Sequence, residues 1–340
     1  MLLELDDPMS RKWWVLAAVA CGAFMATLDS SIVNIALPTL TKELGPDLYR
    51  IKWVVIIYLL VITCLLLPFG RLSDQYGRKV IFQIGFGVFV LGSALCGMSP
   101  TLFWLVFSRS IQAIGASMLM ANGPAIITSA FPSNERGRAL GTLAMVVSAG
   151  LISGPTIGGL LITQFGWRSI FWLNVPFGIM GAMLAHSQLA PDKPPKQRVP
   201  FDWAGAVIQS ILLLSFIVIF DPPNISVSGS IPYSIEPWMM ILVTLVLGVI
   251  FIKVELEAKA PLFDLSLLKI RTFWTANLAS FLTFVAFSSV SVLMPFFLEE
   301  VMRYPPQLAG LFMSSVPITI LIVAPIAGRL SDRFGSQELS

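Results

Sequence analysis

The stretch Gly70-Arg-Leu-Ser-Asp-Gln-Tyr-Gly-Arg-Lys79 returns near the other end of the chain as Gly328-Arg-Leu-Ser-Asp-Arg-Phe-Gly335. Each copy follows an apolar run of about twenty residues, the length that an α-helix needs to cross ~30 Å of hydrocarbon. We therefore interpret each copy as a tight, charged turn at a membrane surface. Because one turn of this kind serves one helical bundle, two copies predict an internally duplicated membrane protein.

The composition agrees with a chain that lies mostly in lipid. The mean hydropathy is +0.82, and 56% of the residues are hydrophobic while only 12% are charged. Only helices and closed barrels satisfy their backbone in lipid, and the apolar runs here are continuous rather than alternating. The sequence therefore predicts an all-α polytopic membrane protein. Ten segments are long enough to span: residues 13–36, 52–72, 79–98, 102–131, 139–163, 168–188, 203–221, 237–256, 273–298 and 306–328.

The distribution of lysine and arginine predicts the orientation. If the N-terminus lies inside, 16 of the 22 basic residues fall on the inner side, as the positive-inside rule requires. We expect both ends of the chain to be cytoplasmic and the protein to lie in the cell membrane (plasma or inner membrane). The net charge of +3 reflects this asymmetry and does not indicate a nucleic-acid partner.

Spacing along the chain predicts three parts. Six spans crowd into residues 1–190, two additional linker spans occupy residues 191–262, and residues 263–340 hold the first two helices of a second bundle. The two turns are offset by 258 residues, and the surplus over one six-helix unit accommodates the two intervening helices. Repeats of this parallel kind are a known plan of transporters, with the substrate site between the halves.

No pattern in the chain indicates an enzyme. Cys21, Cys64 and Cys96 lie within apolar runs, at spacings that fit neither a metal site nor a redox site. Nothing resembles a nucleotide-binding loop, a catalytic triad or a metal cluster. We therefore expect neither enzymatic activity nor a cofactor.

One acidic residue lies inside the first span, in Leu28-Asp29-Ser-Ser-Ile-Val-Asn34-Ile-Ala-Leu-Pro38. An aspartate in a span costs ~2.5–3.5 kcal/mol on insertion scales, so it needs a partner, water or a proton. Burial disfavours the charged form of a carboxyl, which suits reversible protonation. The alternative is a structural hydrogen bond between helices. Asn34 is a candidate for lining the same cavity, and Pro38 is expected to end the helix.

The fourth span contains Arg109-Ser-Ile-Gln112-Ala-Ile-Gly115. A buried arginine demands a counter-charge or carbonyl groups. At 1.5 Å rise per residue, Asp29 and Arg109 both lie ~10 Å from the outer ends of their spans. In the family that these motifs resemble, the first and fourth helices of a half both face the cavity, so we hypothesise that the two residues sit at matching depth and influence each other's charge state. A purely structural tie is the alternative interpretation.

Glycines mark two further places. Gly150, Gly154 and Gly158 share one helix face, with Gly159 and the kinking Pro155 beside them, and this pattern lets another backbone approach closely. Gly70 and Gly77 permit unusual backbone angles in the first turn. Within that turn, Asp74 can cap a helix or pair with Arg78, and Arg78 and Lys79 hold the turn on the cytoplasmic side.

Together these motifs resemble the major facilitator superfamily, specifically its fourteen-spanner drug:proton antiporter branch of the EmrB/QacA type. The resemblance covers essentially the whole chain, although Ala113 stands where the family usually has glycine. It implies a major facilitator fold, an architectural role for residues 166–178, and the following roles. Asp29 and Arg109 would couple protons, and Asn34 and Gln112 would line the substrate cavity. The antiporter motif would be the glycine-rich segment with Gly150, Gly154, Pro155, Gly158 and Gly159. A conformational latch would be formed by Gly70, Asp74, Gly77, Arg78, Lys79 and Asp332.

The latch aspartate of this family engages a late helix of the other half. Since the chain ends five residues after the second turn, the resemblance implies that four spans are absent. We thus expect a complete N-terminal six-helix bundle and a C-terminal bundle truncated after the tenth span, so the late helix that would meet Asp74 would be missing.

The expected function is proton-coupled efflux of small hydrophobic or cationic compounds by alternating access. The partners would be a small-molecule substrate, protons and the lipid bilayer, and the sequence identifies no adaptor or outer-membrane partner. Two alternatives stay open: export of one specific metabolite, and a non-transporting fragment of such a transporter.

Overall fold

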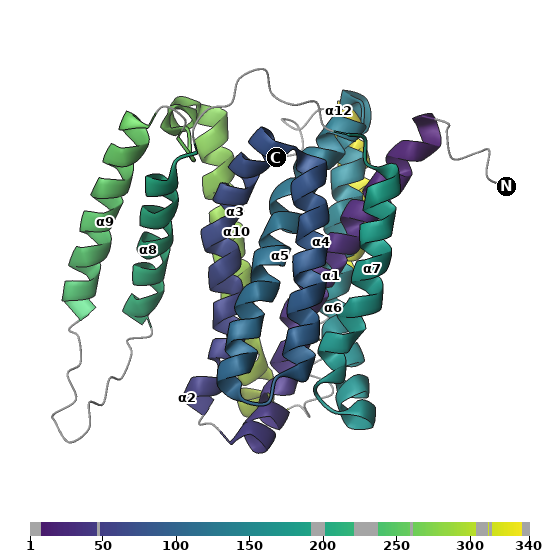
Figure 1. Cartoon of the computed structure of the whole chain (residues 1–340), viewed down its shortest axis with the longest axis vertical. Coiled ribbons are helices and arrows are strands. Elements are labelled where there is room, and N and C mark those ends of the chain that lie inside the picture. The colour runs from purple at the N-terminus through teal and green to yellow at the C-terminus, as the bar shows by residue number, and fades with distance from the viewer. Residues whose placement is uncertain are drawn as a thin grey trace.

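The structure, a computed structural model, describes residues 8–45, 48–191, 201–220, 237–258, 261–303, 312 and 315–334 (Figure 1). Within these ranges the regular structure is entirely helical, with ten long helices. They are α1 (Pro8–Leu44), α3 (Trp53–Tyr76), α4 (Arg78–Met98), α5 (Leu102–Ala130), α6 (Arg136–Phe165), α7 (Ser169–Gln188), α8 (Trp203–Phe220), α9 (Pro237–Glu257), α10 (Arg271–Phe296) and α12 (Ser315–Phe334). Short helices are α2 (Leu48–Ile51), η1 (Ser133–Glu135), η2 (Leu265–Lys269) and η3 (Phe297–Val301).

Each predicted span has a helix in the structure. Seven of the described helices are long and apolar enough to cross a membrane, and α8 and α12 contain shorter apolar stretches. The tenth predicted span starts at residue 306, but residues 304–311 lie outside the described part of the chain, and α12 begins at Ser315.

The prediction that Pro38 ends the first helix is wrong, because α1 continues through Pro38 to Leu44. A proline removes one backbone donor and can kink a helix without stopping it where neighbouring contacts hold the next turn. Ala36 and Leu40, on either side of the proline, are both fully buried. Packing therefore carries the helix past the proline.

Six long helices pack into one bundle, in which α1 contacts α5, α6 and α7, α4 lies between α5 and α7, and α3 packs on α5. Two clusters of buried side chains fill its interior. Phe82, Phe86 and Phe89 belong to one, and Ile32 and Trp167 belong to the other. In lipid such packing is held by close van der Waals contact rather than by the hydrophobic effect.

The remaining long helices are attached differently. The α8–α9 hairpin stands beside α3, on the side away from α7 (Figure 1), and α8 contacts α3. The helix α12 packs along α6. Both copies of the repeated stretch begin within the last two turns of a helix, α3 or α12. In the first copy Gly77, with φ 103°, separates α3 from α4 in a conformation that favours glycine. Its counterpart Gly335 lies outside the described residues.

Candidate functional site

The aspartate of the first span lies in the middle of α1 with none of its surface exposed. Three side chains from two other helices donate hydrogen bonds to its carboxylate. From α5, Arg109 forms an ion pair with Oδ2 through Nη1, and Gln112 Nε2 donates to Oδ1 at 2.8 Å. From α7, Asn174 Nδ2 also donates to Oδ1 at 2.8 Å. Asp29 is therefore the point at which α1, α5 and α7 are joined.

The guanidinium of Arg109 is equally buried and is held from several sides. Its Nε donates to the Val54 carbonyl at 3.1 Å, and Nη1 also donates to Gln112 Oε1 at 2.7 Å. The group lies 4.0 Å from the centre of the Tyr58 ring, whose hydroxyl donates to the Ala26 carbonyl. Nη2 finds no hydrogen-bond acceptor among the described residues, so the aromatic face is the additional contact that compensates the cation.

Gln112 extends the network into α4. Its Nε2 also donates to Ser93 Oγ at 2.8 Å, and the Cys96 thiol points to its Oε1 at 3.7 Å. The network thus links five helices, α1, α3, α4, α5 and α7, around one carboxylate. Chemically it can hold a single negative charge in a dry interior, and it can rearrange if that charge is neutralised by a proton.

The structure brings some predicted site residues together and separates others. Asp29 and Arg109 meet directly. Gln112, predicted to line a substrate cavity, is fully buried in the network instead, because both of its amide atoms are engaged. Asn34 is exposed on α1 and donates to the Ser30 carbonyl at 3.4 Å. Asn174 was expected to be architectural, yet it contacts the carboxylate.

The predicted glycine face of α6 packs on α1, inside the same bundle. A Cβ at Gly150 would overlap Thr27, and a Cβ at Gly154 would overlap Ser31. Gly158 lies against Ile32, whereas a Cβ at Gly159 would meet nothing within 4 Å, and Pro155 is exposed. The close approach therefore fixes the helix that carries Asp29.

Comparison with known proteins decides the family. The sequence model described as Major Facilitator Superfamily matches residues 19–339. The chain belongs to the major facilitator superfamily. It is 37% identical over 332 residues to the riboflavin transporter RibZ of Clostridioides difficile (strain 630), covering 97% of this chain and 70% of RibZ.

Other relatives have different names. The multidrug resistance protein Stp of Mycobacterium tuberculosis (strain CDC 1551 / Oshkosh) is 30% identical, covering 95% of this chain and 59% of Stp. Among solved structures, the proton:xylose symporter XylE bound to 6-bromo-6-deoxy-D-glucose superposes with a TM-score of 0.64 at 14% identity. That match covers 98% of this chain and 72% of XylE. It shows the major facilitator fold.

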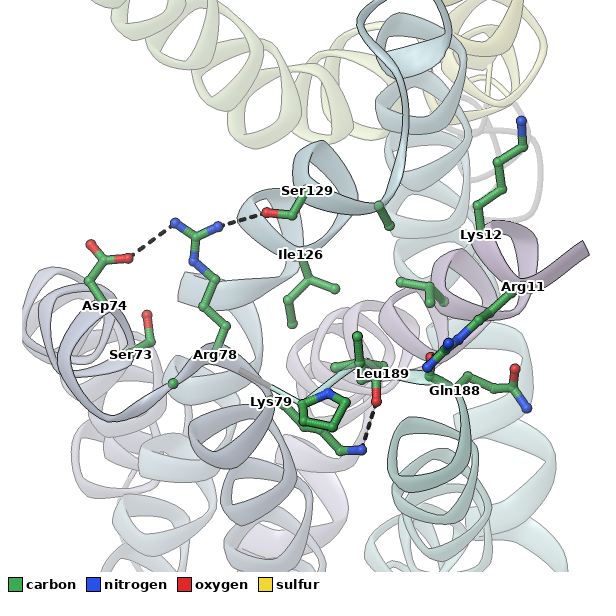
Figure 2. A pocket seen from close by; sticks show the side chains of 15 residues that line it. Arg11, Lys12, Ser73, Asp74, Arg78, Lys79, Ile126, Ser129, Gln188 and Leu189 are labelled. Carbon is green, nitrogen blue, oxygen red and sulfur yellow. Dashed lines mark hydrogen bonds and ion pairs between the residues drawn. The ribbon is translucent and has the colours of Figure 1, made fainter. Parts of the chain in front are cut away.

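Four of the six predicted latch residues of this major facilitator protein, Asp74, Gly77, Arg78 and Lys79, line a cavity of about 550 Å³. Figure 2 shows it between the start of α1, the α3–α4 turn and the ends of α5 and α7. Asp74 pairs with Arg78 at 3.1 Å, and Arg78 also donates to Ser129 Oγ at 2.9 Å. Lys79 donates to the His186 and Leu189 carbonyls, at 2.9 and 2.7 Å. These bonds tie the first turn to its own bundle.

The second copy of the turn makes the contact between the repeats. Asp332 on α12 accepts the backbone N–H groups of Gly137 and Arg138, at 2.6 and 2.7 Å, and so caps the start of α6. Gly137 and Gly328 allow this approach, since a Cβ at Gly137 would lie 2.6 Å from the Gly328 carbonyl oxygen. An aspartate at a helix N-terminus is favoured by the free N–H groups and the helix dipole.

Comparing the two aspartates tests this contact. Asp332→Ala is expected to lower the free energy of unfolding by about 0.5–2 kcal/mol, because it leaves two N–H groups at a helix start without their acceptor. Asp74→Ala removes only a half-exposed ion pair and should cost about 0–1 kcal/mol. Unfolding of the detergent-solubilised protein measures both. Equal losses would show that Asp332 does not stabilise the α6–α12 contact.

Proposed function

We propose that the chain is a proton-coupled exporter of small hydrophobic or cationic compounds that works by alternating access, in the fourteen-spanner drug:proton antiporter branch. The observation that supports this most is the completely buried Asp29 carboxylate, paired with Arg109 and bonded to α5 and α7. An ionisable pair inside a membrane bundle is expected to have a transport role.

In this proposal Asp29 carries the proton, and Arg109 adjusts the proton affinity of the Asp29 carboxylate. Protonation removes the negative charge, so Arg109 loses its counter-charge and the bonds from Gln112 and Asn174 weaken. Because those bonds join α1 to α5 and α7, their loss allows the helices to separate. A cationic substrate that enters the opened site competes with the proton, and this competition produces antiport.

The proposal gives the turns and the glycine face supporting roles. Asp332 on the start of α6 and Asp74 in the first turn would latch the state that is closed at the end where α1 begins. That end is the one that the positive-inside rule predicts to be cytoplasmic. The α1–α6 contact at Gly150, Gly154 and Gly158 would transmit movement of α6 to the helix that carries Asp29.

A second candidate is the transport of one metabolite. The 37% identity to a protein named as a riboflavin transporter favours this alternative, while relatives named for multidrug or methyl viologen resistance favour the first. Since the chain spans 59% of Stp and 70% of RibZ, whole-transporter activity is best assayed with the protein expressed from its native gene.

Transport in inside-out vesicles tests the proposal. With an imposed proton gradient, we expect uptake of tetraphenylphosphonium, a lipophilic cation, and proton release from the lumen when the cation is added. Asp29→Asn should abolish both, because an amide cannot exchange a proton, whereas Glu257→Gln, at an exposed position on α9, should leave both unchanged. Proton-driven transport that survives in Asp29→Asn would overturn the proposal.

The same assay separates the alternatives. Movement of riboflavin without movement of tetraphenylphosphonium would support the metabolite transporter. Absence of any substrate-dependent proton movement, in protein shown by its unfolding transition to be folded, would support the non-transporting alternative.

A further inference from the structure

A second group of polar side chains, buried or half-buried, lies on the α8–α9 hairpin, far along the chain from the Asp29 network. It consists of Asp202, immediately before α8, Gln209 on α8 and Glu255 near the end of α9. Arg71 on α3 lies close enough to act electrostatically on Glu255. We name these four residues the hairpin cluster. The contact between α3 and α8, with the Cys64 thiol 3.7 Å from the Ser210 carbonyl, holds the hairpin beside Arg71.

Each acid in the hairpin cluster uses one oxygen for a structural hydrogen bond. Asp202 Oδ1 accepts the Gly205 N–H at 2.8 Å and caps α8. Glu255 Oε2 accepts the Phe263 N–H at 3.2 Å, which fixes the chain that follows α9. The local fold therefore needs both acids in place, whatever their protonation state.

The other two oxygens approach one point. A Cβ placed on Gly205 would lie 2.8 Å from Glu255 Oε1 and even closer to Asp202 Oδ2. The missing side chain of glycine thus admits both carboxyl groups to the same face of α8. Both oxygens are buried, and neither has a hydrogen-bond donor among the described residues.

The hairpin cluster has more buried hydrogen-bond acceptors than donors. Glu255 is 3% exposed, and Gln209, one turn beyond Gly205 on the same face of α8, is 7% exposed. Within the described part of the chain, the Oε1 atom of Gln209 also lacks a donor, as does the pair of carboxyl oxygens, while Arg71 Nε lacks an acceptor. A buried acceptor without a donor destabilises the fold, because it has lost its hydrogen bond to water without replacing it. A proton on one carboxyl group would turn an acceptor into a donor.

The net charge of the hairpin cluster also favours the binding of one proton. Two ionised carboxyl groups and one guanidinium leave one net negative charge, and like charges this close disfavour joint ionisation. One added proton makes the hairpin cluster neutral, which is the cheapest state for a buried group.

We propose that Asp202 and Glu255 share one proton and form a second protonation site, at the base of the α8–α9 hairpin. The shared hydrogen lies between Asp202 Oδ2 and Glu255 Oε1, and Arg71 balances the remaining negative charge. The proton comes from the solvent on the side where α1 begins. This site is separate from Asp29 and does not depend on the proposed transport activity.

Among the described residues, the other charged groups that act near the pair lie on α3 and at the start of η2. Arg71 faces the site from α3, and Asp264 lies at the start of η2, near Arg71. Hydrogen bonds from Ser266 lower the pKa of Asp264, so this exposed acid stays ionised and does not take the proton. Glu257 on α9 is exposed and serves as a control.

The proposal predicts that the hairpin loosens as pH rises. Loss of the proton leaves two facing carboxylates, whose repulsion pulls Asp202 from Gly205 and Glu255 from Phe263. At lower pH the shared proton removes that repulsion and both backbone contacts persist. The site would therefore fasten the hairpin to α3 when it is protonated.

Infrared difference spectroscopy of the purified chain in lipid nanodiscs tests for the proton. An Asp29→Asn background removes the buried acid of the first network, so the result is independent of the transport proposal. Between alkaline and acidic pH, we expect a carboxylic-acid band equivalent to one proton per chain. The band should vanish in Glu255→Gln and in Asp202→Asn, which keep the size of each side chain, and should persist in Glu257→Gln.

Hydrogen exchange supplies the second readout. After correction for the intrinsic pH dependence of exchange, the Gly205 and Phe263 amides should exchange at least tenfold faster once the proton is lost. Exchange in Glu255→Gln, which mimics a protonated acid, should not change with pH. A band that survives in both variants, or one that sodium ions displace at constant pH, would overturn the shared proton. Exchange at these amides that does not depend on pH would overturn it as well.

Discussion

Arg109→Met is expected to lower the free energy of unfolding by about 3–5 kcal/mol, the cost of leaving one partner of a buried ion pair without its counter-charge. Methionine fills much of the volume of the arginine stem and is flexible enough to adapt to the site. The loss therefore reports the stranded Asp29 carboxylate rather than a cavity. Unfolding in mixed micelles of increasing denaturing detergent measures it.

A double-mutant cycle separates the ion pair from general disruption. Adding Asp29→Asn to Arg109→Met removes the stranded charge, so the double variant should recover a large part of the stability that Arg109→Met loses. The coupling energy for residues in one such network is about 0.5–3 kcal/mol or more. Arg109→Lys keeps the charge but loses the planar guanidinium, so its free energy of unfolding should lie between those of the unchanged protein and Arg109→Met. If the two single losses simply add, Asp29 and Arg109 do not stabilise each other and the pairing is incidental.

The matching depth of these two residues could be predicted from the sequence, whereas their direct contact also requires the first and fourth helices to face one cavity, which the family resemblance implied. A constant rise per residue turns a position in the sequence into a height in the membrane, and the cost of a buried charge demands a partner at that height. Asn174 was missed as a partner because an uncharged amide carries no such demand. Its role depends on which face of α7 meets α1, and this is decided by packing. The signal available was an amide within an otherwise apolar span.

The sequence indicated which face of a helix makes a close contact, but it did not indicate which neighbouring helix that face contacts. The spacing of Gly150, Gly154 and Gly158 indicated a close helix contact, but the same spacing fits any neighbouring helix, and the structure places α1 there. Likewise, the repeat of the charged turn predicted two equivalent elements. Asp332 nonetheless caps α6 while Asp74 pairs with Arg78, because each copy meets different neighbours.

The hairpin cluster shows a further limit of pattern reading. Asp202 and Glu255 are separated by two helices, and each looks like an ordinary charged residue at the end of a span. Only the antiparallel arrangement of α8 and α9 brings them to the same end, and only the absence of a side chain at Gly205 lets them face each other.

Gly154→Ala is expected to destabilise the bundle by about 1–3 kcal/mol, and by more if the backbones cannot separate. The new methyl group would overlap Ser31 Oγ, which can rotate away. It would also lie 2.9 Å from Ser31 Cβ and 3.0 Å from the Ile32 nitrogen, which cannot. Because α1 must then retreat from α6, the Asp29 contacts to α5 and α7 should loosen with it.

Gly159→Ala provides the matched control, since it lies on the same helix and its new methyl group would meet nothing within 4 Å. Alanine is a better helix former than glycine by about 0.8–1.0 kcal/mol, so this variant should gain stability while Gly154→Ala loses it. The two substitutions share their intrinsic helix preference, and their difference therefore isolates the α1–α6 contact. A thermal unfolding series gives both values. Two shifts of the same sign and size would mean that α6 does not press on α1 at Gly154, and the link from the glycine face to the Asp29 network would have to be abandoned.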